Sequence, residues 1–175
     1  SKYEPTSSEL NFDSFRMLAS QETLSEFERI GFTDENRQNF SANICDDIVK
    51  KLCLEEHHGG AFLDIGCGAG ELTELLLKNC INYDMSIVLN DSIEMLRNVK
   101  FDGHFVPISG RFPGTFDEIV KINPKGYNAI LCYSVFHYIA KETNPEEFIN
   151  RIYQLLASDG IALIGDIPNS SQRKR

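Results

Sequence analysis

A run of alternating glycines limits what this chain can fold into more than any other feature of the sequence. The run reads Phe62-Leu63-Asp64-Ile65-Gly66-Cys67-Gly68-Ala69-Gly70-Glu71. Its apolar beginning is typical of a strand that is buried on both faces of a parallel sheet, and its glycines predict a tight turn. Residues 71–78 follow with an apolar stripe at helical spacing. We therefore expect a strand, a glycine turn and a helix N-terminus, where a ligand can approach the backbone closely.

The spacing of these glycines, and the acid before them, narrow the class of ligand. The glycines follow the pattern G-x-G-x-G, whereas the dinucleotide fingerprint is G-x-G-x-x-G. Asp64 stands two residues before Gly66. A carboxylate at this position would repel a pyrophosphate and attract an ammonium group. The pattern therefore favours a ligand that carries an ammonium group.

The run D-x-G-x-G-x-G from Asp64 to Gly70 resembles motif I of the class I S-adenosylmethionine (SAM) dependent methyltransferases. The resemblance covers about residues 60–167. It implies an α/β, Rossmann-like fold with a doubly wound, mainly parallel sheet in the strand order 3-2-1-4-5. It also implies an enzyme with SAM as its cofactor and S-adenosylhomocysteine (SAH) as its product.

Strand and helix patterns alternate after the glycine turn. Apolar segments predict further strands at residues 85–89, 104–108, 127–133 and 161–165, separated by helices. Pro107 suits an edge strand better than the centre of a sheet. The fold that the resemblance implies continues with a sixth strand and an antiparallel seventh, and both are missing here. We therefore expect residues 59–175 to form a SAM-binding domain that is truncated at its C-terminal end.

Residues 1–58 are expected to form a helical N-terminal cap. Helical patterns cover about residues 11–20 and 24–30, and a longer amphipathic pattern runs from residue 35 to about 56. The run His57-His58-Gly59-Gly60 then predicts a solvated helix end.

The amino-acid composition limits the classes of binding partner that we expect and indicates the cellular compartment. The 175 residues carry a net charge of -9, from 17 basic and 26 acidic residues. Basic residues cluster only at residues 173–175, so we expect no binding to nucleic acid. No apolar run approaches the roughly 20 residues of a membrane span and no signal peptide is evident, so we expect a cytoplasmic protein without membrane association. The five cysteines form no C-x-x-C pair, which predicts free thiols and no metal site. The oligomeric state is not indicated.

The resemblance assigns cofactor contacts to the ends of the first two strands. In motif I these residues are Asp64, Gly66, Cys67, Gly68 and Gly70, with the Asp64 carboxylate facing the cofactor's ammonium group. After the second strand, the family usually has an acid two residues before the Ser of a D-x-S-x-x-M-L run, and this acid binds the ribose. Here Asn90 stands at that position and Asp91 is next to it, followed by Ser92 and Met95. Either Asp91 binds the ribose, which we favour, or Asn90 does so; alternatively Asp91 only caps the next helix.

The ends of the third and fourth strands complete the expected cofactor site. The family's acid for the adenine amino group is missing from the run Ser109-Gly110-Arg111-Phe112. Ser109 or the backbone takes its place, and Phe112 is a candidate to stack on the ring. At the fourth strand, Cys132-Tyr133-Ser134 resembles motif IV, whose main chain closes on the ammonium group. It is not the N-P-P-Y type that acts on nucleobase amines.

His137 and Asp166 are the candidate catalytic residues. His137 follows the fourth strand, and its neutral imidazole can take a proton from an acceptor hydroxyl. The alternative for His137 is a role in stabilising its loop. Asp166 follows the fifth strand and either orients the acceptor or His137, or forms a turn before Pro168.

The expected reaction is methyl transfer to a small-molecule acceptor, such as a hydroxyl of a sugar or a related metabolite. The chain also resembles a methyltransferase subgroup associated with bacterial surface-carbohydrate synthesis. Two other functions remain open: a SAM-binding partner subunit without catalysis, which the missing strands suggest, and a nucleotide-dependent oxidoreductase, against which Asp64 and the glycine spacing argue.

Overall fold

The computed structural model describes residues 12–20, 38–133 and 144–165. Its centre is a five-stranded parallel sheet in the order β3-β2-β1-β4-β5. The strands are β1 (Ala61–Ile65), β2 (Ser86–Asp91), β3 (Val106–Ser109), β4 (Tyr127–Tyr133) and β5 (Leu156–Gly165). The predicted α/β fold class and strand order are therefore confirmed.

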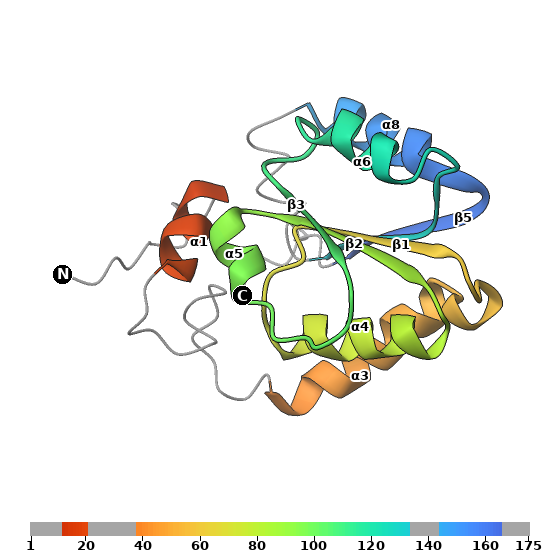
Figure 1. Cartoon of the computed structure of the whole chain (residues 1–175), viewed down its shortest axis with the longest axis horizontal. Helices are drawn as coiled ribbons and strands as arrows, with labels where there is room; N and C mark the ends of the chain where they lie inside the picture. The colour runs from red at the N-terminus through yellow and green to blue at the C-terminus, as the bar shows by residue number, and fades with distance from the viewer. Residues whose placement is uncertain (1–11, 21–37, 134–143, 166–175) are drawn as a thin grey trace, which may run out of the picture.

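Helices cover both faces of this sheet. The helices α3 (Gln38–Lys51) and α4 (Glu71–Asn82) lie on one face, and α6 (Phe116–Ile122) and α8 (Pro145–Leu155) lie on the other (Figure 1). The core under α3 and α4 contains Phe62, Leu89 and Leu131, whereas the core under α6 and α8 contains Leu63, Ile130 and Phe148. Since successive strand residues alternate between the two cores, a residue's place in the register assigns its face.

A short helix near the N-terminus packs at the end of the sheet where β1 and β2 finish. This helix, α1 (Phe12–Ala19), lies beside α5 (Ile93–Arg97) (Figure 1). Arg16 Nε donates a hydrogen bond to Glu94 Oε1 at 2.9 Å. Arg111 Nη2 lies 3.3 Å from Asp13 Oδ2, and its guanidinium carbon lies 5.0 Å from the centre of the Phe12 ring. The helix expected at residues 11–20 is thus present, while the one expected at 24–30 falls outside the described residues.

The helix expected from residue 35 to 56 ends earlier than its pattern predicts. Its last α-helical residue is Lys51, and Cys53 adopts a left-handed conformation (φ 50°) before the short 3-10 helix η2 (Leu54–Glu56). A left-handed residue ends an α-helix because it turns the following N–H groups back toward the last carbonyls. The prediction of a solvated end is wrong for His57, which is buried with its Nδ1 3.8 Å from Asp159 Oδ2. The division into a cap at 1–58 and a domain at 59–175 stays a prediction.

The two edge strands differ in how well their patterns predicted them. β3 is an edge strand, as Pro107 indicated. β5, the other edge, begins at Leu156, directly after α8, and is longer than expected. Leu156 pairs with Tyr127, and the register then shifts before Ile161 pairs with Ala129. The Asp159-Gly160 sequence, which is typical of a turn, is therefore part of an irregularity within a strand.

The described residues were compared with what disulfides, membrane-spanning helices and metal sites require. All five cysteines are free. Among these residues, none of the helices combines the length and the apolar character that a membrane crossing needs. The same ranges contain no group of three or more side chains that could hold a metal ion.

Candidate functional site

The glycine turn follows β1 and is fixed from two sides. Gly66 and Gly68 have φ values of 70° and 65°, in the left-handed region that favours glycine. The Gly66 N–H donates to the Asn90 carbonyl at 2.7 Å, and Thr73 Oγ1 donates to the Cys67 carbonyl at 2.6 Å. A Cβ placed on Gly68 would meet no heavy atom within 4 Å. β2 and α4 therefore hold the turn, while the open side of Gly68 leaves room for a ligand.

Two buried carboxyl groups lie beside this turn. Asp64 pairs in register with Leu89, so Asp91, two residues further along β2, projects from the same face of the sheet. Asp64 is 3% exposed and Asp91 is 9% exposed. Asp91 Oδ2 accepts a hydrogen bond from the Gly68 N–H at 2.9 Å, and its Oδ1 accepts one from the Ser92 N–H at 2.7 Å. Asp91 is therefore tied directly to the glycine turn.

In the part of the chain that the structure describes, these two carboxyl groups are buried without a matching positive charge. Burial raises the pKa of Asp64 well above its usual range, and the charge of Asp91 raises it further. Burial raises the pKa of Asp91 to about 6, although the hydrogen bonds from the Gly68 and Ser92 backbone lower it. Within the described residues, no Lys, Arg or His contributes to either pKa. Because a cation favours ionised carboxylates, the pair fits a ligand that carries an ammonium group.

Asn90 and Asp91 have different surroundings although they are adjacent in sequence. Neighbouring residues of a strand project to opposite faces. Asn90 Nδ2 donates to the carbonyls of Ile108 and Gly110, at 2.9 and 3.0 Å. Asn90 thus fixes the end of β3, whereas Asp91 lies at the glycine turn. Of the two candidates for ribose binding, this geometry favours Asp91.

Ser92 and Met95 support the turn through local structure. Ser92 is the N-cap of α5, and its Oγ accepts a hydrogen bond from the Met95 N–H at 3.2 Å. Met95 is buried and packs against Ala69 of the glycine turn. Ser92 therefore fills the capping role that was the alternative for Asp91.

The residues after β3 are divided between the surface and the core. Ser109 and Arg111 are exposed, and the Gly110 N–H donates to the Asp91 carbonyl at 3.0 Å. Phe112 is 3% exposed and packs edge to face against Phe148, with ring centres 5.1 Å apart. Phe112 belongs to the core under α8, which corrects the prediction that it stacks on an adenine ring.

Thr115 is a polar residue that the sequence did not single out. It is 5% exposed, and its hydroxyl has no hydrogen-bond partner among the residues that the structure describes. Its Cγ2 lies 2.8 Å from the place that a Cβ on Gly110 would occupy. A buried, unpaired hydroxyl is therefore close to the end of β3, where the family's adenine-binding acid is missing. In the sequence Thr115 resembles an ordinary helix cap, so no signal could have distinguished it.

β4 ends beside the site with two side chains on opposite faces. Cys132 is fully buried in the core under α6 and α8, where burial raises its pKa. Tyr133 is half-buried on the face that also carries Asp64, and its ring lies over Gly165 of β5. Ser134, His137 and Asp166 fall outside the described residues, so their roles stay predictions.

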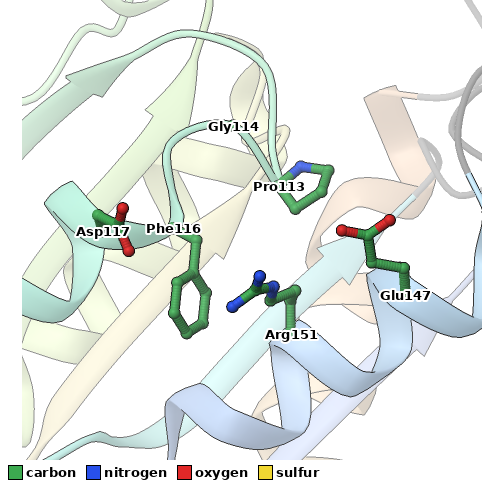
Figure 2. Close-up of a pocket in the computed structure, with 6 residues that line it drawn as sticks. All are labelled: Pro113, Gly114, Phe116, Asp117, Glu147 and Arg151. Atoms are coloured by element: carbon green, nitrogen blue, oxygen red, sulfur yellow. The ribbon is translucent and has the colours of Figure 1, made fainter.

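A separate hollow of about 210 Å³ opens on the other face of the sheet, between α6 and α8. Figure 2 shows Arg151 of α8 beside the Phe116 ring, and the two are 4.6 Å apart from guanidinium carbon to ring centre. Because Asp64 and Asp91 project from the opposite face, this hollow is not part of the glycine-turn site. It is lined by Pro113, Gly114, Phe116, Asp117, Glu147 and Arg151.

Known proteins share both the sequence pattern and the fold. Residues 34–175 match a family described as a methyltransferase domain. Nodulation protein S of Azorhizobium caulinodans is 28% identical over 126 residues, which cover 70% of this chain and 56% of that protein. "Putative methyltransferase GWCH70_2453" of Geobacillus sp. (strain WCH70) is 27% identical over 121 residues, which cover 66% of this chain and 46% of that protein. The chain spans about half the length of these curated relatives.

A solved structure agrees with the fold. The plantazolicin methyltransferase BpumL in complex with SAH aligns with a TM-score of 0.52 and 19% identity, covering 86% of this chain and 57% of that one. This likeness supports the Rossmann-like architecture, and the family match covers the glycine turn and all five strands. The chain therefore belongs to the methyltransferase domain family, and its predicted relationship to the class I SAM-dependent methyltransferases is confirmed.

Proposed function

We propose that this chain binds SAM at the carboxyl ends of β1 and β2 and transfers its methyl group to a small-molecule acceptor. One observation carries the proposal: Asp64 and Asp91 are buried beside a glycine turn whose open side leaves room for a ligand. SAM carries an ammonium group and a sulfonium, so it would supply the positive charge that the described residues do not place beside these carboxylates.

The glycine turn and the strand ends around it then have defined parts in binding. The Asp64 carboxylate accepts hydrogen bonds from the ammonium group, as charge-assisted pairs do. Asp91 uses the lone pairs that its two backbone bonds leave over and accepts the ribose hydroxyls. Gly68 allows the cofactor to approach the backbone. The Thr115 hydroxyl and Ser109 are the candidates for the adenine end.

The chemistry follows from positioning. SAM supplies an electrophilic methyl group, which leaves the sulfur as the acceptor's oxygen bonds to its carbon, and neutral SAH remains. The chain aligns the two reactants, a contribution of up to roughly 7–11 kcal/mol. His137 is the proposed base that takes the hydroxyl proton, and Asp166 the proposed residue that orients it; a base adds about 10²–10⁴ in rate.

The proposed acceptor is a hydroxyl of a sugar or a related metabolite. The acidic composition, with a net charge of -9, disfavours nucleic acid as a substrate. The resemblance to the carbohydrate-associated subgroup supports the sugar.

Calorimetry with SAM, SAH and NAD tests the binding part of this proposal. SAM and SAH should bind and NAD should not, and Asp64→Asn should weaken both sulfur compounds. Isotopically labelled SAM, incubated with sugar, acid and nucleotide-sugar acceptors, tests the transfer. Binding of NAD alone would overturn the proposal. Tight SAM binding without transfer to any acceptor, under conditions where the chain stays folded, would favour the non-catalytic partner subunit.

A further inference from the structure

We propose that Thr73 of α4 is a positioning residue, which acts through the Cys67–Gly68 peptide group to hold the Asp91 carboxylate in the place that ribose binding needs. This inference rests on the proposed function, because it takes Asp91 as the residue that accepts the ribose hydroxyls. Thr73 has no contact with the ligand in this arrangement, and its effect passes through the peptide group.

This peptide group of the glycine turn is held at both ends. Its carbonyl, from Cys67, accepts a hydrogen bond from Thr73 Oγ1 at 2.6 Å. Its N–H, from Gly68, donates to Asp91 Oδ2 at 2.9 Å. A peptide group is planar, so its carbonyl and its N–H point in opposite directions and can only turn together. Thr73 and Asp91 therefore fix the orientation of one rigid unit from its two sides.

The fold brings Thr73 and Asp91 to the same face of the sheet. Asp91 projects from the same face as Leu89, which belongs to the core under α3 and α4. Thr73 lies in the first turn of α4 and is 4% exposed. A threonine inside a helix often donates to the carbonyl four residues earlier, whereas Thr73 reaches six residues back, outside its helix. Its hydroxyl therefore serves the glycine turn and not α4.

The two hydrogen bonds of this peptide group reinforce each other. A hydroxyl that donates to an amide carbonyl polarises the amide and makes its N–H a better donor. The Gly68 N–H lowers the pKa of Asp91, against the effect of burial. Loss of the Thr73 hydroxyl should therefore weaken the hydrogen bond to Asp91 and raise the pKa of this carboxyl group.

Thr73 can be replaced without altering the charges around Asp91. Two titratable groups interact electrostatically with Asp91: the Asp64 carboxyl of β1 and the Cys67 thiol of the turn. Within the described residues, α5 and the end of β3 add no charged group that contributes to the pKa of Asp91. Thr73→Val removes a hydroxyl, keeps a branched side chain of similar size and leaves both titratable groups in the chain. A changed pH dependence in this variant therefore reports on the shared peptide group.

Calorimetry with SAH and carboxyl NMR of this chain test the inference. At pH 7.5, Thr73→Val should weaken SAH by about 3- to 10-fold, while Thr73→Ser, which keeps the hydroxyl, should bind as the parent chain does. The loss in Thr73→Val should be larger at pH 6, because more of its Asp91 then holds a proton. Without ligand, the Asp91 carboxyl signal should titrate at a higher pH in Thr73→Val than in the parent chain. Because Thr73 acts through Asp91, combining Thr73→Val with Asp91→Ala should weaken SAH no more than Asp91→Ala alone.

A second buried hydroxyl provides the matched control. The Tyr127 hydroxyl donates to the Ile119 carbonyl at 2.9 Å, in the core under α6 and α8 on the other face of the sheet. Tyr127→Phe removes the same kind of hydrogen bond as Thr73→Val does. It should lower the melting temperature and leave both the SAH affinity and the titration of Asp91 unchanged.

The inference is wrong if Asp91 titrates in a folded Thr73→Val as it does in the parent chain. A double variant whose loss equals the product of the single losses would also overturn it, as would a loss of SAH affinity in Tyr127→Phe equal to that in Thr73→Val. If Thr73→Val does not fold, Thr73→Ala decides: a titration of Asp91 equal to that in Thr73→Ser excludes a role for the hydroxyl. A parent chain that binds no SAH would overturn the proposed function, and the ligand-free titration would still test the link from Thr73 to Asp91.

Discussion

Asp64 and Asp91 are carboxylic acids of adjacent strands that face the same side of the sheet, and the charge of Asp91 adds to the effect of burial in raising the pKa of Asp64. Two such groups have no favourable partner in each other, because their ionised forms repel. A ligand cation stabilises the ionised carboxylates, and so offsets both the cost of burying them and their mutual repulsion. The pair therefore links ligand binding to pH.

We predict that SAH binds more tightly at pH 7.5 than at pH 5. Burial raises the pKa of Asp91 to about 6, so below that pH the carboxyl group holds a proton, which must leave before both of its oxygens can accept hydrogen bonds from the ribose hydroxyls. Calorimetry near pH 6 in two buffers of different ionisation enthalpy should detect release of protons on binding. Asp91→Asn should reduce the number released. An SAH affinity that is constant from pH 5 to 7.5 would contradict this linkage.

The same pKa predicts how the ligand-free chain responds to pH. The pKa of Asp91 is about 6 in the folded chain against an ordinary 3.8, so between these values the folded state binds more protons than the unfolded state. The contribution of Asp91 to the free energy of unfolding should therefore fall as the pH rises from about 4 to 6, and change little above. Urea titrations measure the free energy of unfolding at each pH. This free energy should fall between pH 4 and 6 more steeply for the parent chain than for Asp91→Asn. Parallel pH curves for the two would show that Asp91 does not titrate in this range.

Asn90→Ala should mainly lower the stability of the fold, whereas Asp91→Ala should mainly lower the affinity for SAH. Removing the Asn90 amide leaves the carbonyls of Ile108 and Gly110 without its hydrogen bonds, which should cost about 1–3 kcal/mol of stability. Asp91→Ala should instead cost about 1.5–3 kcal/mol of SAH binding, as for a charged hydrogen bond. Melting curves and calorimetry on both variants measure the two losses. If Asn90→Ala loses more SAH affinity than Asp91→Ala, the ribose assignment is wrong.

Gly68→Ala should block the ligand without preventing folding. Its φ of 65° strains any other residue by about 1–2 kcal/mol, but its Cβ would meet no protein atom within 4 Å and would point into the open side of the turn. Gly59 offers a control, since it has a φ of 71° and equally open surroundings, away from the site. Gly59→Ala and Gly68→Ala should lower the melting temperature alike, while only Gly68→Ala loses SAH in calorimetry. An unchanged SAH affinity in Gly68→Ala would remove the turn from the site.

The ion pairs of α1 should affect the local opening of this helix and have little effect on the stability of the whole fold. Arg16 and Asp13 are both more than half exposed, and ion pairs at such exposed places add little to stability because water and salt screen them. The combined variant Asp13→Asn, Arg16→Gln should therefore speed hydrogen exchange of the α1 amides and leave the global melting temperature almost unchanged. Raising the salt concentration should have the same effect on the parent chain. If neither the substitutions nor the salt changes the hydrogen exchange of α1, then apolar packing alone holds the helix.

The alternation of strands and helices could be predicted because it depends on local pattern, whereas the strand order was implied by the family resemblance and is confirmed, and the ligand position stays a prediction. The glycines, Asp64 and the alternation of apolar segments are each visible within a few residues. The choice between Asn90 and Asp91 was open because it depends on which face each residue takes, and a shift of one residue exchanges the faces. Phe112 was assigned wrongly for a related reason, because its partner Phe148 lies far along the chain.

Pairings between distant segments explain the other differences. His57 is buried and lies 3.8 Å from Asp159 of β5, and no feature of residues 57–60 indicates that neighbour. β5 extends back to Leu156 because Tyr127 offers a pairing there, although the Asp159-Gly160 sequence is typical of a turn. The unpaired hydroxyl of Thr115 likewise depends on packing around Gly110.

The central place of β1 has a consequence for how the protein is made. β1, β2 and β3 are neighbours in the sheet and lie within residues 61–109, so a nascent chain that has emerged to residue 109 already carries the glycine turn and both carboxyl groups. β4 and β5, with Tyr133 and Gly165, reach their places on the other side of β1 only later in synthesis. Until they do, β1 has one edge without a hydrogen-bonded neighbour, and that edge is open to pairing with other strands.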